Sequence, residues 1–198
     1  MKTEHLSAIE NGIFEYLLVA NPDADVREKV MAEKQNFYDE YREKSAISTI
    51  PHITVTNFLA REAMEDTIIR WMERICSKQQ SFIVTLNNYS GFPPHSIYLR
   101  VQNATPFQQL AQELKAVNTY VSSCSCPPMN LISRPHVSIS NSLSEEVYFK
   151  ALTQYSHKSF HESFVVNELL LLRRKHQYDT CKTINVFALQ PGDNELFN

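Results

Sequence analysis

A seven-residue phrase that occurs twice in this chain carries a histidine and two hydroxyl side chains at fixed spacing. The copies are PHITVTN at residues 51–57 and PHVSISN at residues 135–141. In both copies polar residues alternate with branched apolar ones, which is the period-2 pattern of a half-buried β-strand. Each predicted strand therefore presents one imidazole and two hydroxyls on the same face.

The side chains on that face could bind and transform a phosphoryl group. They are His52, Thr54 and Thr56 in the first copy, and His136, Ser138 and Ser140 in the second. Because an imidazole has an ordinary pKa of about 6.5, one ring can act as a base while the other acts as an acid near neutral pH. Hydroxyls held on rigid strands can donate hydrogen bonds to oxygens on which charge accumulates. If the fold brings the two faces together, they form a site for phosphoryl transfer without a metal.

Two other interpretations of the motifs are a copied structural strand and a zinc site. A core strand gains nothing from three polar side chains on one face, because each buried polar group needs a partner. Zinc could bind both histidines with a third, but hydroxyls are poor zinc ligands and no carboxylate or cysteine accompanies either motif. We therefore expect no metal and no cofactor.

The repeat extends beyond the two phrases. The offset of 84 residues between the two motif histidines also carries Pro22 onto Pro106, and the apolar run at residues 13–20 onto residues 97–104. Each of these prolines follows a residue of helix-capping type, which predicts a helix start at both places. The chain is therefore expected to contain a duplicated strand-helix-strand-helix-strand unit.

The remaining pattern predicts helices that cover antiparallel sheets. A capping box at Ser142 and Glu145 predicts the start of one helix. Further strands are expected at residues 82–86, 97–101, 164–172 and 184–189. These lengths indicate an α+β fold with two pseudo-symmetric lobes, each a mainly antiparallel sheet covered by helices, around a central cleft. The expected organisation is one bilobal domain over residues 1–198, with lobe 1 at about 10–90, lobe 2 at about 95–172 and a closing C-terminal strand at about 184–190.

Composition narrows the class of protein. The formal net charge of −3 argues against coating of nucleic acid by bulk electrostatics. The four cysteines form no CxxC pair, and none of the three glycines lies in a phosphate-binding glycine loop. The N-terminal residues show no signal-peptide or membrane-spanning pattern. We therefore expect a reduced, cytoplasmic monomer with no membrane attachment and no tight non-specific binding of nucleic acid.

The paired motifs resemble the H-x-[S/T]-apolar motifs of the two-histidine phosphoesterase superfamily, which includes bacterial 2'-5' RNA ligase-like proteins and cyclic nucleotide phosphodiesterases. The resemblance implies a bilobal fold with both motif strands side by side in a central cleft. It also implies metal-independent action on 2',3'-cyclic phosphate or 2'-5' linkages, with RNA ends or cyclic nucleotides as substrates. It further implies that His52 and His136 are catalytic and that Thr54 and Ser138 bind phosphoryl oxygens.

Other candidate residues depend on weaker patterns. Thr56 and Ser140 lie outside the family pattern, so their expected phosphate binding comes from strand alternation alone. Further candidate substrate contacts are the aromatic side chains of Phe14, Tyr16, Tyr98 and Tyr178, and the guanidinium groups of Arg173 and Arg174. The alternatives are core packing for the aromatic residues and a solvated turn for the arginines.

A binding module is the competing function. Each of these residues can hold a phosphate without catalysing a reaction, so the chain could recognise RNA ends or nucleotide phosphates without turnover.

Overall fold

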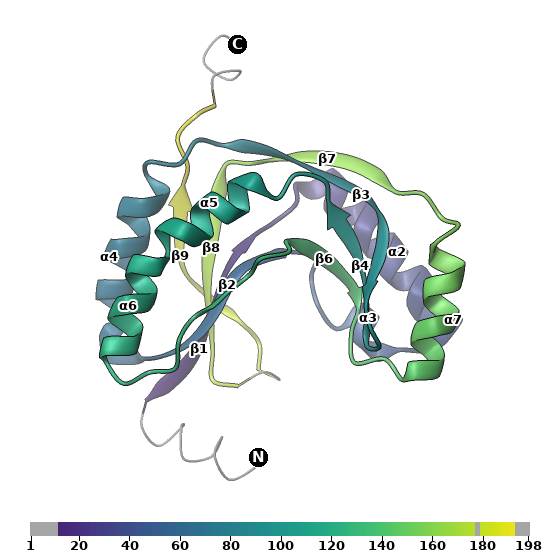
Figure 1. Ribbon diagram of the computed structural model, residues 1–198, viewed down its shortest axis with the longest axis horizontal. Coiled ribbons are helices and arrows are strands. Elements are labelled where there is room, and N and C mark those ends of the chain that lie inside the picture. The colour runs from purple at the N-terminus through teal and green to yellow at the C-terminus, as the bar shows by residue number, and fades with distance from the viewer. Residues whose placement is uncertain (1–11, 177–178, 193–198) are drawn as a thin grey trace.

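Within residues 12–176 and 179–192, which the computed structural model describes, nine strands form one continuous sheet that bends into an arch (Figure 1). The elements in chain order are β1 (Ile13–Ala20), α2 (Ala24–Tyr41), α3 (Lys44–Ile47), β2 (Ile53–Arg61), η1 (Glu62–Met64), α4 (Glu65–Cys76), β3 (Phe82–Phe92), β4 (Ser96–Val101), α5 (Thr105–Glu113), α6 (Lys115–Ser123), β5 (Asn130–Leu131), β6 (His136–Ser140), α7 (Glu145–Tyr155), β7 (His161–Val166), β8 (Glu168–Arg174) and β9 (Lys182–Ala188).

The two strands that carry the repeated phrase lie in the middle of this sheet. The strand order is β7-β3-β4-β6-β2-β1-β8-β9, and β5 pairs with β2 outside this path. All pairs of named strands are antiparallel. The predicted α+β class with a mainly antiparallel sheet is therefore confirmed, and β2 and β6 join the two ends of the sheet.

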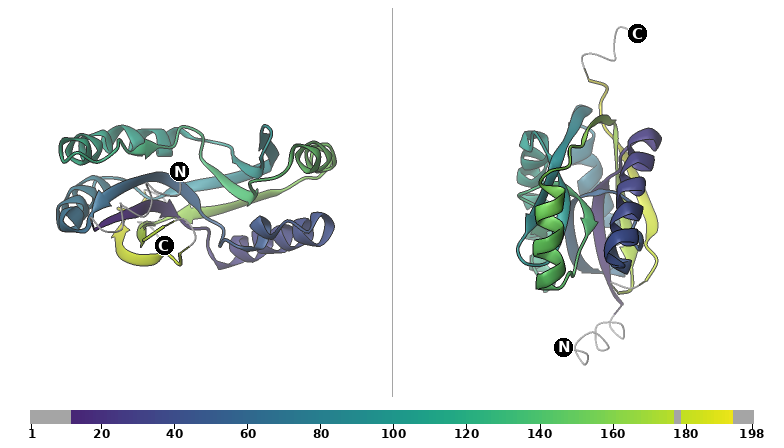
Figure 2. Two further views of the ribbon diagram at one scale, coloured as in Figure 1. Left: turned by 90° about the horizontal axis from the view of Figure 1, so that it is seen from below. Right: turned by 90° about the vertical axis from the view of Figure 1, so that its right-hand side faces the viewer.

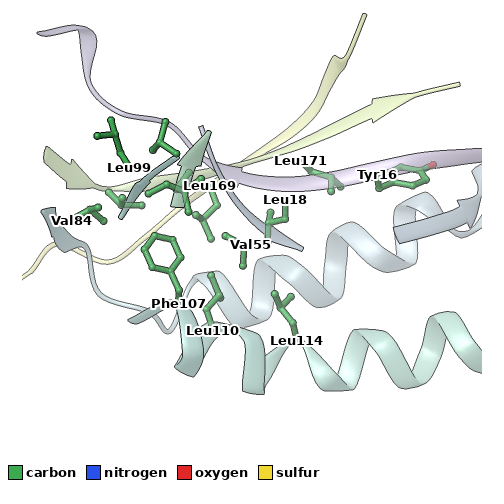
Figure 3. Packing of buried hydrophobic residues seen from close by; sticks show 14 of the residues in the cluster. Tyr16, Leu18, Val55, Val84, Leu99, Phe107, Leu110, Leu114, Leu169 and Leu171 are labelled. Atoms are coloured by element: carbon green, nitrogen blue, oxygen red, sulfur yellow. The ribbon is translucent and has the colours of Figure 1, made fainter. Parts of the chain in front are cut away.

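Helices pack at both ends of the arch. The helices α4, α5 and α6 lie at the end formed by β2, β1, β8 and β9, whereas α2, α3 and α7 lie at the end formed by β6, β4, β3 and β7 (Figures 1 and 2). Figure 3 shows Phe107, Leu110 and Leu114 directed at the buried strand residues Val55 and Leu18. This packing follows from the helical spacing of those apolar residues. Among the described residues, no helix has the length and apolar character needed to span a bilayer.

Each half of the sequence contributes to both ends of the sheet. The strand β3 follows α4 in the chain but pairs with β4 and β7 at the opposite end. Conversely, β8 pairs with β1 and β9. The helix α2 follows β1 but packs on β6 and β7. These exchanges tie the two ends together and place α2 next to the second motif.

Three local predictions were wrong. The run at residues 164–172 is not one strand, because it divides at Asn167 into β7 and β8, which lie at opposite ends of the sheet. The helix α2 begins after Asp23, whose carboxylate accepts a hydrogen bond from the Val26 N–H, and not at Pro22.

The predicted capping box also starts at the wrong serine. Ser142 has a positive φ of 57°, which places it in a turn, whereas Ser144 is extended and its hydroxyl oxygen accepts a hydrogen bond from the Val147 N–H. In contrast, a helix does start at the second proline: α5 begins at Thr105 with Pro106 in its first turn, although Ala104 and not Thr105 is the N-cap residue.

Candidate active site

A small cavity opens where β2 meets β6. Its volume is about 50 Å³, and it is lined by Thr49, Ile50, His52, Thr54, His136 and Ser138. One water needs about 10–15 Å³ of such space, so the cavity can take a small polyatomic group. In the part of the chain that the structure describes, no three His, Cys, Asp or Glu side chains gather as a metal site would require.

The register of the two motif strands brings their polar side chains together. Ile53 pairs with Val137 in an antiparallel ladder. Extending that register by one residue in each direction sets His52 opposite Ser138 and Thr54 opposite His136. Directly opposed side chains have Cβ atoms about 4.5–5.5 Å apart. Each imidazole therefore lies across from the hydroxyl of the other motif.

Both imidazoles are oriented in the same way. Nδ1 of His52 lies 2.8 Å from the Ile50 carbonyl oxygen, and Nδ1 of His136 lies 2.8 Å from the Arg134 carbonyl oxygen. A carbonyl can only accept, so Nδ1 of each ring carries the hydrogen and donates it. The neutral ring then has its lone pair on Nε2. Each histidine therefore has one fixed tautomer, with Nε2 available to accept a proton from a ligand.

The electrostatic surroundings of the two rings differ. Burial lowers the pKa of both His52 and His136, and the hydrogen bond to the carbonyl opposes this shift in each case. The positive charges of Lys34 and Arg174 lower the pKa of His52 further. Both rings are thus biased toward the neutral form, and nearby cations add to this bias at His52.

The third polar residue of each motif does not reach the cavity. The ladder between β1 and β2 has an extra residue on β2 at Val55, and the ladder between β4 and β6 has an extra residue on β6 at Ile139. A β-bulge of this kind re-aims the side chains that follow it. Strict alternation, from which the role of the third polar residue is expected, therefore ends at the bulge in both strands.

The hydroxyls beyond the two bulges are bonded within the protein. Thr56 is fully buried and donates to the Asn130 carbonyl oxygen at 2.9 Å, while Ser140 is fully buried with its Oγ 2.6 Å from that of Ser45. In this structure neither of these hydroxyls is available to a ligand in the cavity.

Among the candidate aromatic contacts that the structure describes, only Tyr98 lies against a cavity-lining histidine. Its ring stacks on Phe92, with centroids 4.3 Å apart, and lies 4.9 Å from the ring of His136. Tyr16 is fully buried, stacks on Phe58 and donates to a Glu65 carboxylate oxygen, so it is unavailable to a substrate (Figure 3). Tyr178 lies outside the described residues.

Phe14, Arg173 and Arg174 line a different, larger pocket of about 340 Å³. Arg173 lies 2.8 Å from carboxylate oxygens of Glu62 and Glu65, with its guanidinium over the Phe14 ring, and Arg174 forms a two-point ion pair with Glu15. Both arginines are therefore ion-paired with neighbouring carboxylates. The structure does not bring them into the small cavity, although the charge of Arg174 reaches His52.

One polar residue near the cavity has no signal in the sequence motifs. Lys34 lies in the middle of α2 and is 1 % exposed. Its ammonium nitrogen is 3.2 Å from Thr49 Oγ1 and 3.2 Å from the Ser138 carbonyl oxygen. A lysine within a helix rich in charged residues predicts a solvated side chain, and only the packing of α2 against β6 reveals the contact.

Comparison with known proteins gives one family and a group of solved structures. The family model of the 2'-5' RNA ligase superfamily matches residues 22–177. LigT of E. coli complexed with 3'-AMP is 16 % identical with a TM-score of 0.68, and the match covers 89 % of this chain and 98 % of that chain. TT0787 of Thermus thermophilus is also 16 % identical, with a TM-score of 0.69 and the same coverage. LigT complexed with ATP is 14 % identical with a TM-score of 0.62, covering 90 % of this chain and 99 % of that chain. No curated protein matches the sequence.

Proposed function

Because this chain belongs to the 2'-5' RNA ligase superfamily, we propose that it is a metal-independent phosphodiesterase with 2',3'-cyclic phosphate or 2'-5' phosphodiester groups of RNA or nucleotides as substrates. The observation that carries the proposal is the shared cavity. Two imidazoles with fixed tautomers and two hydroxyls from separate motifs line a space of about 50 Å³. That set supplies an acid, a base and hydrogen-bond donors for one phosphoryl group.

In the proposed hydrolysis, the neutral imidazole takes a proton from water as the water oxygen attacks phosphorus. The protonated imidazole gives its proton to the departing sugar oxygen as the bond between that oxygen and phosphorus breaks. The hydroxyls of Thr54 and Ser138 donate to the non-bridging oxygens, where negative charge develops. At the end of the cycle the two rings have exchanged protonation states, and water restores them.

The charges around the two rings support an assignment of roles. The Lys34 ammonium and the Arg174 guanidinium disfavour a positive charge on His52, whereas His136 lies against the rings of Phe92 and Tyr98. His52 is therefore the proposed base, and His136 is the proposed acid.

The bound ligands of structurally similar proteins support a nucleotide substrate. LigT has been solved with 3'-AMP, with NADP+ and with ATP, all of which carry phosphate groups. A binding module would use the same residues without turnover, so product formation is the property that separates the two functions.

The proposal is tested by hydrolysis of 2',3'-cyclic nucleotides in the presence of excess chelator. Replacing His52 or His136 by Ala is expected to lower kcat/KM by about 10²–10⁴-fold, the range typical of a lost general acid or base. His157→Ala is the matched control, because His157 is exposed and does not line the cavity. Analysis of the products also identifies which sugar oxygen departs. Binding without turnover by the parent protein would contradict the enzyme and support the module.

A further inference from the structure

Lys34 is a buried cation whose described partners are all neutral. Its ammonium lies 3.2 Å from Thr49 Oγ1, 3.2 Å from the Ser138 carbonyl oxygen and 3.5 Å from the Ile139 carbonyl oxygen. These acceptors account for its three hydrogens, and no carboxylate among the described residues forms an ion pair with it. Burying a charge without an opposite charge is costly, and burial lowers the pKa of Lys34 to about 8.

The backbone geometry of the motif does not require this charge. The repeat places Asn118 of α6 at the position equivalent to Lys34, and its side-chain oxygen accepts a hydrogen bond from the Met129 N–H. At the bulge of β2, the Val55 carbonyl oxygen accepts from the Ile132 N–H, which is neutral. The equivalent carbonyl of the β6 bulge, on Ile139, faces the Lys34 ammonium. The carbonyl oxygen at the β2 bulge is thus hydrogen-bonded to a backbone N–H, whereas the carbonyl oxygen at the β6 bulge is hydrogen-bonded to the Lys34 ammonium.

Thr49 connects this cation to the cavity. Thr49 lines the cavity, and its hydroxyl oxygen accepts a hydrogen bond from Lys34. The hydroxyl hydrogen must then point away from the ammonium, and none of the described residues accepts it. An acceptor inside the cavity would take a hydrogen bond from the Thr49 hydroxyl. If that acceptor is an anion, it would also compensate the buried positive charge of Lys34.

We infer that Thr49 is a third hydroxyl donor to the phosphoryl group, backed by Lys34 as a positioning residue. This inference rests on the proposed function, because it adds to the same site. In the complex, the Thr49 hydroxyl donates to a non-bridging phosphoryl oxygen while its own oxygen accepts from the ammonium. The ammonium also holds the carbonyls of Ser138 and Ile139, which fixes the strand segment that aims the Ser138 hydroxyl into the cavity.

Binding of sulfate tests the inference directly, because sulfate keeps its charge of −2 across neutral and alkaline pH. Thr49→Val is expected to raise the sulfate Kd by about tenfold at pH 7, the size of one charge-assisted hydrogen bond, and Thr49→Ser is expected to restore it. Thr119→Val is the matched control, because Thr119 is an exposed threonine whose hydroxyl donates to a helix carbonyl.

The pH dependence of sulfate binding tests the role of Lys34 separately. The parent protein is expected to lose affinity above about pH 8, where Lys34 gives up its proton, and Lys34→Met is expected to lack that loss. A structural role alone would lower affinity equally at all pH values.

Failure of this inference can be distinguished from failure of the proposed function. A parent protein that hydrolyses cyclic nucleotides but is unaffected by Thr49→Val overturns the inference alone. A parent that binds sulfate in a Thr49-dependent way but hydrolyses nothing supports the inference and overturns the enzyme. A parent that binds neither sulfate nor cyclic nucleotide contradicts both.

Discussion

The β2 motif and the β6 motif have nearly the same local structure and different surroundings. Each holds its imidazole by a hydrogen bond from Nδ1 to the carbonyl two residues earlier, at 2.8 Å, and each has a bulge three residues after the histidine. Around His52 lie the charges of Lys34 and Arg174, whereas around His136 lie the rings of Phe92 and Tyr98. The repeated sequence thus builds two similar halves of a site, and residues far away in the chain make them unequal.

The strongest test of this comparison is whether the two halves act as one unit. A double His52→Ala and His136→Ala variant is expected to lose about as much kcat/KM as the worse single variant, about 10²–10⁴-fold, because either loss alone disables proton transfer. Single-turnover rates with a 2',3'-cyclic nucleotide measure the three variants against the parent. Losses that multiply would show that the two rings work independently.

Within each motif, the hydroxyl before the bulge should contribute to kcat and the hydroxyl after the bulge should not. Thr54→Val and Ser138→Ala are each expected to lower kcat by about 10²-fold, as removal of a donor to developing charge does in other enzymes. Thr56→Val is expected to leave kcat within a few-fold of the parent and to lower the Tm, because the Thr56 hydroxyl is buried and donates to a carbonyl. If Thr56→Val lowers kcat as strongly as Thr54→Val, the bulge does not separate their roles.

The unequal charges should appear in the pH dependence of kcat/KM. A base that must be neutral and an acid that must be protonated give a bell-shaped profile, whose apparent pKa values belong to the pair. Burial and then the Lys34 charge lower the pKa of His52, so Lys34→Met is expected to move the acidic limb to higher pH. Lys29→Met on the same helix is the control, since Lys29 is exposed and paired with Asp25 and Glu162. An acidic limb that stays in place in Lys34→Met would contradict the assignment of His52 as the base.

The smallest expected effect is on stability. Both motif histidines have a lowered pKa in the folded protein, so below about pH 6.5 the unfolded chain binds more protons than the folded one. The free energy of unfolding is therefore expected to fall as the pH drops from 7.5 to 5.5. Urea unfolding should show a smaller decrease in the double alanine variant than in the parent. An identical decrease in both proteins would indicate that the rings are not biased toward the neutral form.

Local patterns in the sequence predict those parts of the site that are set by residues adjacent in the sequence. Alternation within one strand puts His52 and Thr54 on a common face, and the repeat does the same for His136 and Ser138; the structure lines one cavity with all four. Their roles in catalysis remain predictions. Alternation fails beyond Val55, because a bulge depends on the partner strand and has no signature in the strand that carries it.

Long-range packing accounts for what the sequence does not reveal. Lys34 belongs to a helix with a charged surface, and its burial results from α2 crossing to β6, a strand more than 100 residues later. Tyr16 is a similar case, since this expected substrate contact in the middle of β1 lies fully in the core. The division of residues 164–172 at Asn167 also reflects pairing with two distant strands.

In the proposed site, the imidazoles of two separate motifs both contact one bound anion through Nε2. Histidine ring signals in ¹⁵N NMR spectra test it directly during a titration with inorganic phosphate at constant pH. The Nε2 signals of His52 and His136 are expected to shift together with a single Kd and a stoichiometry of one phosphate per chain, while both Nδ1 atoms stay protonated. A response from only one ring, or two rings that saturate at different phosphate concentrations, would contradict the account.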